Sequence, residues 1–344
     1  MLNQRQRDIL RAVVDDYVST AEPVGSRTLS RKYGLGLSPA TIRNALADLE
    51  DEGLLRQPHT SAGRVPSDQG YRVFVEELMA LSPLAPSVRA DLLRRQAEAE
   101  DLRDLLTQTA RLAAVLSGCT AIVRSPRPAG ARIRALSLVP VTDRKLLLVV
   151  VSSTGAVTHR QVLLEEPIAP EEVAALAVGL QQHLLERPLD ALTGRVLEGL
   201  AERMGRHRDL IRQVIGRVEA PDDAVVIAHT AHLARQPEFQ QRVDGLLDFL
   251  DRPDRVLRWM QEVRGGSSSP GAVTIRIGAE HRDPELQGCS VVAASYTIGD
   301  EVAGEVAVLG PTRLDYATAV TAVSALAAGL SEVFGARLPG EGRQ

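Results

Sequence analysis

Arginine and asparagine stand side by side at positions 43 and 44, in the stretch SPATIRNALADLEDEG. Arginine can donate two hydrogen bonds to the edge of guanine, and asparagine pairs in a similar bidentate way with adenine. Ala40 and Thr41 come just before them, and small residues there let a helix backbone approach the major groove. We therefore expect these four residues to read bases, although an ordinary solvated helix face also fits their types.

A helix with a clearly marked start must carry these side chains. Ser38 is a favourable N-cap, and Pro39 suits the first helical position because its missing N–H costs nothing there. The N–H groups of this first turn are expected to meet phosphate. The apolar residues that face inward recur at helical spacing: Ile42, Ala45, Leu46 and Leu49.

Two shorter helical patterns precede this helix. The apolar positions from Leu2 to Val18 recur every three or four residues, and AEPVGS ends that pattern because proline cannot continue a helix. A second helix is expected from about Ser26 to Tyr33, followed by a tight turn at YGLGLS, where glycines permit positive φ. The order helix, turn, helix matches a helix-turn-helix in which the third helix enters the groove.

The segment LLRQPHTSAGRVPS then predicts a wing, two short strands joined by a basic loop. Its lack of acidic residues and its hydroxyl groups favour contact with the DNA backbone or minor groove, although a flexible surface loop is the alternative. Between Glu22 and Asp48 there are four positive residues and no acid, in a protein of net charge −4. Any attraction to phosphate must therefore be local. The phosphate or minor-groove candidates are Arg27, His59, Thr60, Ser61 and Arg64.

Three stretches resemble one known family. SPATIRNALADLEDEGLLRQPHTSAGRVPSDQGYRVFVEELM resembles the DNA-binding region of the heat-inducible transcription repressor HrcA family, and IRIGAEHRDPELQGCSVVAASY and GEVAVLGPTRLDY resemble its carboxy-terminal signatures. The resemblance implies a GAF-like domain that carries an inserted dimerisation domain. It also implies repression of chaperone operons that ends on heat shock, and a GroEL-type chaperonin partner that keeps the repressor active.

We therefore expect an α+β multidomain protein. The winged helix-turn-helix is assigned to 1–80, the GAF-like α/β sheet domain to 81–129 and 223–344, and the inserted dimerisation domain to 130–222. One helix is predicted from Val88 to about Leu116, and three strands at ALSLVPVT, KLLLVVVSS and AVTHRQVLL. Helical patterns follow at 170–186 and 189–217. One recognition helix spans few base pairs, so we expect a homodimer on a double-stranded inverted-repeat operator.

The residue types favour no enzyme, cofactor or metal site. Lys32 and Lys145 are the only lysines in the sequence, and neither lies in a phosphate-binding loop motif. His229 and His232 lack the further ligands of a metal site. Cys119 and Cys289 adjoin apolar runs, which favours buried, reduced thiols over a disulfide or reactive thiol.

By inspection, no segment approaches the roughly 20 apolar residues of a membrane span, so we expect a cytoplasmic protein without membrane contact. Two other functions remain open. A GAF-like pocket would suit a metabolite-sensing repressor, and a chaperone-binding scaffold would bind DNA only without sequence preference.

Overall fold

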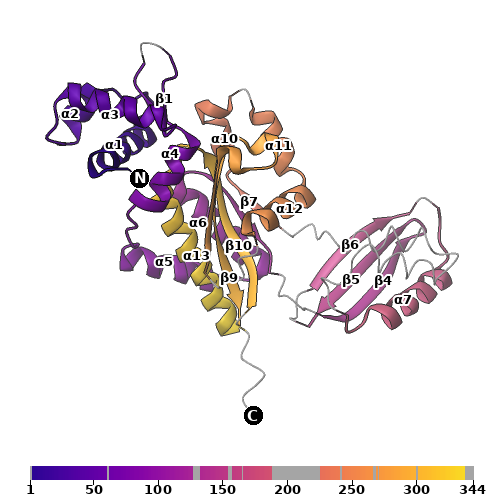
Figure 1. Ribbon diagram of the computed structural model, residues 1–344. Coiled ribbons are helices and arrows are strands. Elements are labelled where there is room, and N and C mark those ends of the chain that lie inside the picture. Colours follow the sequence, from indigo (N-terminus) through magenta and orange to yellow (C-terminus); the bar gives the residue numbers. More distant parts are fainter. Residues whose placement is uncertain are drawn as a thin grey trace. The chain divides into compact units, whose positions relative to one another are not determined.

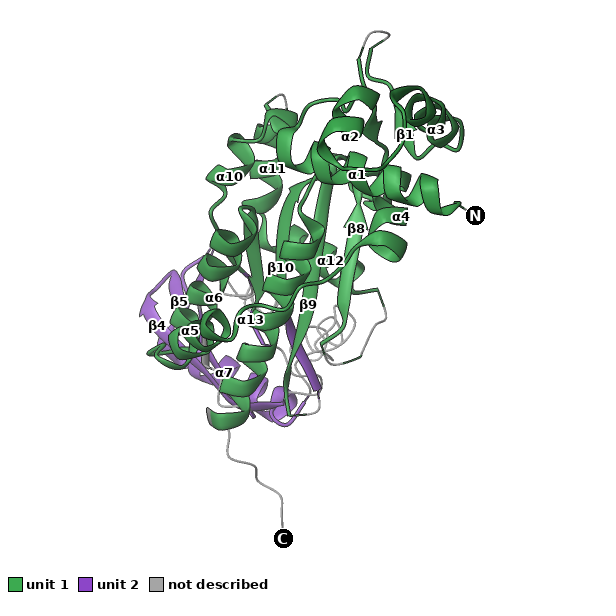
Figure 2. Ribbon diagram, turned by 90° about the vertical axis from the view of Figure 1, so that its left-hand side faces the viewer, with its two compact units in different colours: residues 1–124, 226–299, 305–344 green, residues 125–225, 300–304 purple. Residues whose placement is uncertain are grey.

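The chain forms two compact units in the computed structural model (Figure 2). Unit 1 comprises 1–124, 226–299 and 305–344, and unit 2 comprises 125–225 and 300–304. The structure describes residues 2–59, 62–126, 132–153, 157–164, 166–187, 225–240, 242–265, 269, 271–299 and 301–337. Helices and antiparallel sheets occur in both units, as expected for an α+β protein.

Three helices and a hairpin begin unit 1 (Figure 1). They are α1 (Gln4–Thr20), α2 (Ser26–Lys32), α3 (Pro39–Asp51), β1 (Leu55–Arg56) and β2 (Val65–Pro66). Asn3 and Gln6 form a reciprocal capping box at the start of α1. The expected three helices are confirmed, and their shared core is built from fully buried side chains such as Leu10, Leu29 and Leu49.

The single helix predicted from Val88 to Leu116 is wrong, because the chain folds back on itself there. A short helix α4 (Asp68–Val73) and a π-helical turn η1 (Phe74–Leu78) precede α5 (Pro86–Ala97) and α6 (Leu102–Ser117). Asp101 caps the start of α6 by accepting a hydrogen bond from the N–H of Asp104. Buried Gln96 of α5 donates to the hydroxyl of Thr109 on α6, 3.0 Å away. One straight helix could not bring these two side chains together.

A five-stranded sheet in the order β7-β3-β10-β9-β8 forms the centre of unit 1. The strands are β3 (Thr120–Arg124), β7 (Val225–Ala228), β8 (Val273–Ile277), β9 (Cys289–Ile298) and β10 (Glu301–Pro311). Strand β10 pairs antiparallel with β3, and β8 with β9. Strand β9 is buried on both faces over most of its length, so it reads as a continuous apolar run.

Helices cover both faces of this sheet (Figure 1). The smaller elements are α10 (Ala231–Ala234), η4 (Pro237–Phe239), α11 (Val243–Leu250), η5 (Gly278–Glu280) and η6 (Pro284–Leu286). Helix α12 (Pro253–Arg264) lies over β8, β9 and β10 and buries Trp259, which meets Phe249 of α11 edge to face. The opposite face packs against α6 and the last helix.

That last helix, α13 (Tyr316–Arg337), is long and apolar enough to cross a membrane by length and composition alone. The expectation that no segment reaches this length was therefore wrong. The helix is packed inside unit 1, where Phe334 stacks on Tyr296 of β9 and Leu326 and Leu330 are fully buried. Its apolar composition is accounted for by packing on the sheet.

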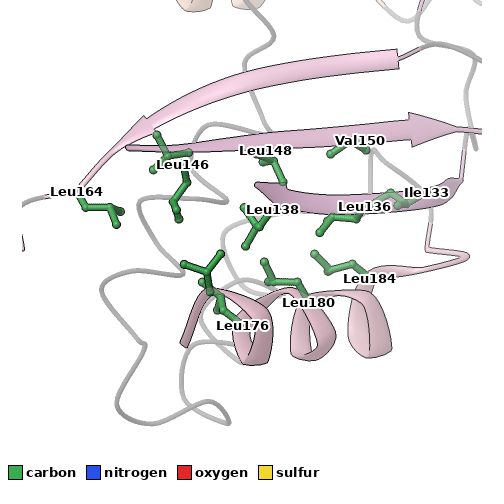
Figure 3. Packing of buried hydrophobic residues seen from close by; sticks show 12 residues of the cluster. Ile133, Leu136, Leu138, Leu146, Leu148, Val150, Leu164, Leu176, Leu180 and Leu184 are labelled. Carbon is green, nitrogen blue, oxygen red and sulfur yellow. The ribbon is translucent and has the colours of Figure 1, made fainter. Parts of the chain in front are cut away.

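Unit 2 contains a three-stranded antiparallel sheet with a helix on one face (Figure 3). The predicted strands are confirmed as β4 (Ile133–Thr142), β5 (Lys145–Ser152) and β6 (Val157–Leu163), followed by α7 (Pro170–Leu184). Alternate residues of the strands, such as Leu146 and Leu148 of β5, point toward Leu176 and Leu180 of α7. The helix predicted at 189–217 lies outside the described residues.

Candidate nucleic-acid interface

Helix α3 begins as its sequence predicts. The hydroxyl oxygen of Ser38 accepts a hydrogen bond from the N–H of Thr41 at 3.1 Å, and Pro39 occupies the first turn. The two hydroxyl groups also lie 2.9 Å apart, so Thr41 is held to the cap. The cap takes up one N–H group that was expected to meet phosphate, and Pro39 removes a second. An anion would therefore have fewer donors in this turn than the bare helix terminus offers.

The helix divides cleanly into a buried face and an exposed face. The apolar side chains predicted to face inward are buried: Ile42, Ala45, Leu46 and Leu49. Arg43 and Asn44 are exposed, together with Ala40 and Ala47, while Thr41 is half-buried. Arg43 and Asn44 are therefore presented to solvent on a helix that is fixed from behind, which is the arrangement that reading a groove requires.

The hairpin after α3 is tied to the rest of the N-terminal helices at its base. Leu55 pairs with Pro66, and Arg56 with Val65. The backbone of Arg64 exchanges two hydrogen bonds with Val24, at 2.8 and 2.9 Å, in the loop between α1 and α2. His59 is exposed in the loop of the hairpin. Thr60 and Ser61 lie outside the described residues, so their predicted phosphate contacts stay predictions.

Arg64, a candidate for contact with phosphate or the minor groove, is paired with an acid from outside its own acid-free stretch. Its guanidinium Nη2 lies 2.7 Å from Oε2 of Glu50, near the end of α3, and the two side chains are 20% and 32% exposed. Glu50 lies in the last turn of α3, 14 residues before Arg64 in the sequence, and its carboxylate reaches the base of the hairpin in the folded chain. Arg64 therefore holds the hairpin to α3 instead of extending freely toward DNA.

The positive charge around α2 is also less free than its composition suggests. Lys32 forms an ion pair with Asp16, a carboxylate of α1 that is almost fully buried. Arg27, Arg31 and Arg43 are exposed, and none of them forms an ion pair within the described part of the chain. Arg31 and Arg56, both exposed, were not among the predicted contact residues, although the charge pattern already contained them.

The histidine pair and the two cysteines behave as structural residues. The rings of His229 and His232 are 5.1 Å apart, and Nδ1 of His232 lies 3.2 Å from the carbonyl oxygen of Cys119. Within the described ranges, no three histidine, cysteine or acidic side chains gather as a metal site would need. Cys119 and Cys289 are free and buried, and burial raises the pKa of each thiol to about 12. Both thiols are therefore protonated and unreactive at neutral pH.

A pocket lies between α12 and the sheet of unit 1. Its polar end holds Glu305, whose carboxylate is paired with buried Arg124 and lies 3.8 Å from Nη1 of Arg264. The remaining lining is mainly apolar and includes Trp259. The enclosed space has room for about one water molecule, far less than a small-molecule site needs.

The chain is similar over nearly its whole length to curated transcription repressors. The family model "HrcA protein C terminal domain" matches residues 103–320. The heat-inducible transcription repressor HrcA of Symbiobacterium thermophilum is 37% identical over 342 residues, which cover 97% of this chain and 99% of that protein. The repressor of the same name from Beutenbergia cavernae is 39% identical over 353 residues, covering 97% of this chain and 100% of that protein.

One solved structure has the same fold. A crystal structure of a hypothetical protein at 2.2 Å resolution superposes with a TM-score of 0.63 and 22% sequence identity. The match covers 98% of this chain and 99% of that chain.

Proposed function

The chain belongs to the HrcA family of heat-inducible transcription repressors, and from this premise we propose how it recognises its operator. The curated members are transcription repressors and not enzymes, in keeping with residue types that favour no catalytic site. The observation that carries the proposal is the exposed pair Arg43 and Asn44 on a capped helix beside a hairpin.

Residues 1–80 act as a winged helix-turn-helix in this proposal. The order of α1, α2, α3 and the β1–β2 hairpin supports it, as does the exposure of the outer face of α3. In the same proposal, 81–129 and 223–344 form a GAF-like domain, and 130–222 form an inserted dimerisation domain. The chain forms most of unit 2 between β3 and β7 and then returns to unit 1, which supports this division.

Each candidate residue then has a role on the duplex. Arg43 and Asn44 read base edges in the major groove, with Ala40 and Thr41 near the entry, and Ser38 and Pro39 fix the start of the helix. Arg27 and His59 contact phosphate, as do Thr60 and Ser61 from the sequence segment between β1 and β2. Arg64 supports the hairpin through Glu50 and reaches DNA only when that ion pair opens.

The repressor binds as a homodimer to an inverted-repeat operator. A single recognition helix spans too few base pairs for useful specificity. Two copies related by a two-fold axis double the number of base pairs that are read. The half-sites then lie one or more helical turns apart, roughly 34 Å for each turn.

Regulation follows the family in this proposal. The operator controls chaperone operons in the cytoplasm, heat shock releases the repressor, and a GroEL-type chaperonin restores its active fold. Marginal stability is sufficient for the thermal step, because a loss of about 1–2 kcal/mol changes the folded-to-unfolded ratio by a factor of about 5–30.

The metabolite-sensing alternative has less support. Its ligand would enter the pocket beneath α12, where there is room for about one water molecule and where Glu305 already has an arginine partner. A ligand of ordinary size would have to move α12 off the sheet.

Selection from a randomised duplex pool tests the proposal directly. The wild-type full-length protein should enrich an inverted repeat, and gel shifts should show binding at low temperature, loss at heat-shock temperature, and recovery when chaperonin is added. Enrichment of sequences without two-fold symmetry, or equal binding to a scrambled duplex, would contradict the proposal. A chaperone-binding scaffold that binds DNA only without sequence preference would give that result.

A further inference from the structure

Helix α4, in the stretch SDQGYR after the hairpin, is held firmly to the DNA-reading part of unit 1. The hydroxyl of Ser67 donates to the carbonyl oxygen of Gly53 at 2.6 Å, and its N–H donates to the carbonyl oxygen of Leu54 at 3.0 Å. Gly70 lies so close that a Cβ there would overlap the Leu54 carbonyl group. Gly53 and Leu54 join α3 to β1, so α4 is fixed to the end of the recognition helix.

The other side of α4 is fixed to the edge of the five-stranded sheet. Oδ2 of Asp68 accepts a hydrogen bond from the N–H of Ala279 at 2.8 Å. Arg72 forms a two-pronged ion pair with Glu280, with its Nε 2.8 Å from Oε1. The same guanidinium donates to the carbonyl oxygen of Ile275 on β8 at 2.9 Å. Paired bonds from a planar guanidinium fix direction as well as distance.

The turn η5 is shaped to receive these side chains. Gly278 has φ of +51°, and a Cβ at this position would overlap the Asp68 carboxylate. Glu280 also accepts from the N–H of Ile277 at 3.0 Å, so its carboxylate is held in place from its own side. Both members of the contact are therefore positioned before they meet, which reduces the freedom lost on forming it.

Apolar contact alone would not define the angle between the two parts. Tyr71 of α4 packs against Tyr316 of α13, with ring centroids 5.8 Å apart, and its buried hydroxyl has no hydrogen-bond partner within the described residues. Such a contact tolerates rotation because dispersion is not directional. Direction comes from polar contacts, and those of Asp68, Arg72 and Glu280 are shorter than the 3.5 Å bond that Nη1 of Arg313 donates to the carbonyl oxygen of Val18 on α1.

We propose that the contact of Asp68 and Arg72 with the Gly278–Glu280 turn is the positioning joint that sets the angle of α3 on the sheet, and with it the half-site spacing that the repressor accepts. This inference rests on the proposed dimeric binding to an inverted repeat. In such a dimer the proposed dimerisation domain, which is inserted into the sheet part, supplies the two-fold axis. A rotation of each DNA-reading part on its sheet therefore moves its helix along the duplex. Arg72, Asp68 and Glu280 touch no base, yet they decide which operators fit.

Distance measurements in the absence of DNA test the joint itself. Spin labels on Asp48→Cys of α3 and Gln261→Cys of α12 report the arrangement in the full-length protein; both sites are exposed, and the native thiols are buried. Glu280→Gln and Asp68→Asn should broaden the distance distribution. Glu332→Gln removes the exposed Arg89–Glu332 ion pair, at 3.4 Å, from the same unit and should leave the distribution unchanged. Distance distributions of equal width in all variants would contradict the proposal that this contact is a positioning joint.

A second experiment tests the effect of this contact on operator specificity. It measures binding to the selected inverted repeat when the spacer is lengthened or shortened one base pair at a time. Glu280→Gln should bind an isolated half-site within about twofold of wild type and lose most of the discrimination between spacers. Arg72→Met should do the same, and the double variant should be no worse, since the two side chains act as one contact. Unchanged spacer discrimination with broadened distances would overturn the inference. Failure of the wild type to prefer an inverted repeat would instead overturn the proposed function.

Discussion

Nη2 of Arg64, at the root of the hairpin, lies 2.7 Å from Oε2 of Glu50, near the C-terminal end of α3. The ion pair joins the two elements expected to hold DNA, so the hairpin and the recognition helix move together. The ion pair also keeps the guanidinium of Arg64 from binding a DNA phosphate. Because both side chains are partly shielded, the pair is more than a transient surface contact.

Glu50→Gln should release Arg64 toward DNA and increase binding to non-specific duplex at low salt. The slope of log K against log salt should become steeper by about 0.9 for one added phosphate contact. Asp51→Asn is a matched control, because it removes one neighbouring negative charge from an exposed residue of the same helix end without freeing Arg64. Anisotropy titrations over a series of salt concentrations measure the salt slopes of both variants. Identical slopes for the two variants would mean that Arg64 stays away from phosphate.

Arg43→Ala should weaken binding to the selected operator by about 1–3 kcal/mol and blur the preference at one base pair of each half-site. The reason is the loss of a bidentate contact to a base edge. Arg31→Ala, an exposed cation of α2, should instead weaken all duplexes alike. Titration of both variants against operators mutated at single positions distinguishes a base-specific loss from a uniform loss. A uniform loss for Arg43→Ala would assign that residue to the DNA backbone.

Ser38→Ala should lower the opening free energy of α3 by about 0.5–2 kcal/mol, because the N–H of Thr41 loses its acceptor. Ser38→Asp keeps an acceptor and should preserve the helix while it weakens DNA binding through repulsion of phosphate. Amide hydrogen exchange in α3 and gel shifts measure the two effects separately. If Ser38→Asp bound DNA as well as wild type, the start of α3 would not face the backbone.

The stability of unit 1 should fall as the pH drops from 6.5 toward 4. Burial, with a smaller effect of Arg276, lowers the pKa of His281 to about 4 from its usual 6.5. In this pH range the unfolded chain therefore binds a proton that the folded chain does not bind. The free energy of unfolding decreases as the pH falls. At 1.36 kcal/mol for each pKa unit, the loss is on the order of 3 kcal/mol.

His281→Gln should flatten this pH dependence, because glutamine does not titrate and can still accept from Trp259 Nε1, which lies 3.4 Å from Nδ1 of His281. The exposed His59→Gln should retain the wild-type profile. Urea unfolding at a series of pH values compares the three proteins. A profile for His281→Gln parallel to that of wild type would show that other groups cause the loss.

Much of the interface was predictable because its signals are local. The cap at Ser38, the proline at position 39 and the inward apolar residues of α3 act within a few residues of each other, and the structure has them as expected. The three strands of unit 2 were predictable for a similar reason, since each is a short apolar run and the turn residues TDRK and STG separate them in the sequence. The break between α5 and α6 was missed, because the periodicity continues on both sides of Asp101.

The sequence by itself determined which helix presents Arg43 and Asn44, since helix starts, caps and faces depend on neighbours along the chain. Tertiary structure alone decided that Arg64 is bound to Glu50, that Lys32 is bound to Asp16, and that α13 is a core helix. It also decided that Arg72 meets Glu280, 208 residues further along the chain. A charge can be counted in a sequence, but its partner depends on which distant segments the folded core brings within a few ångströms, where the Coulomb interaction becomes strong.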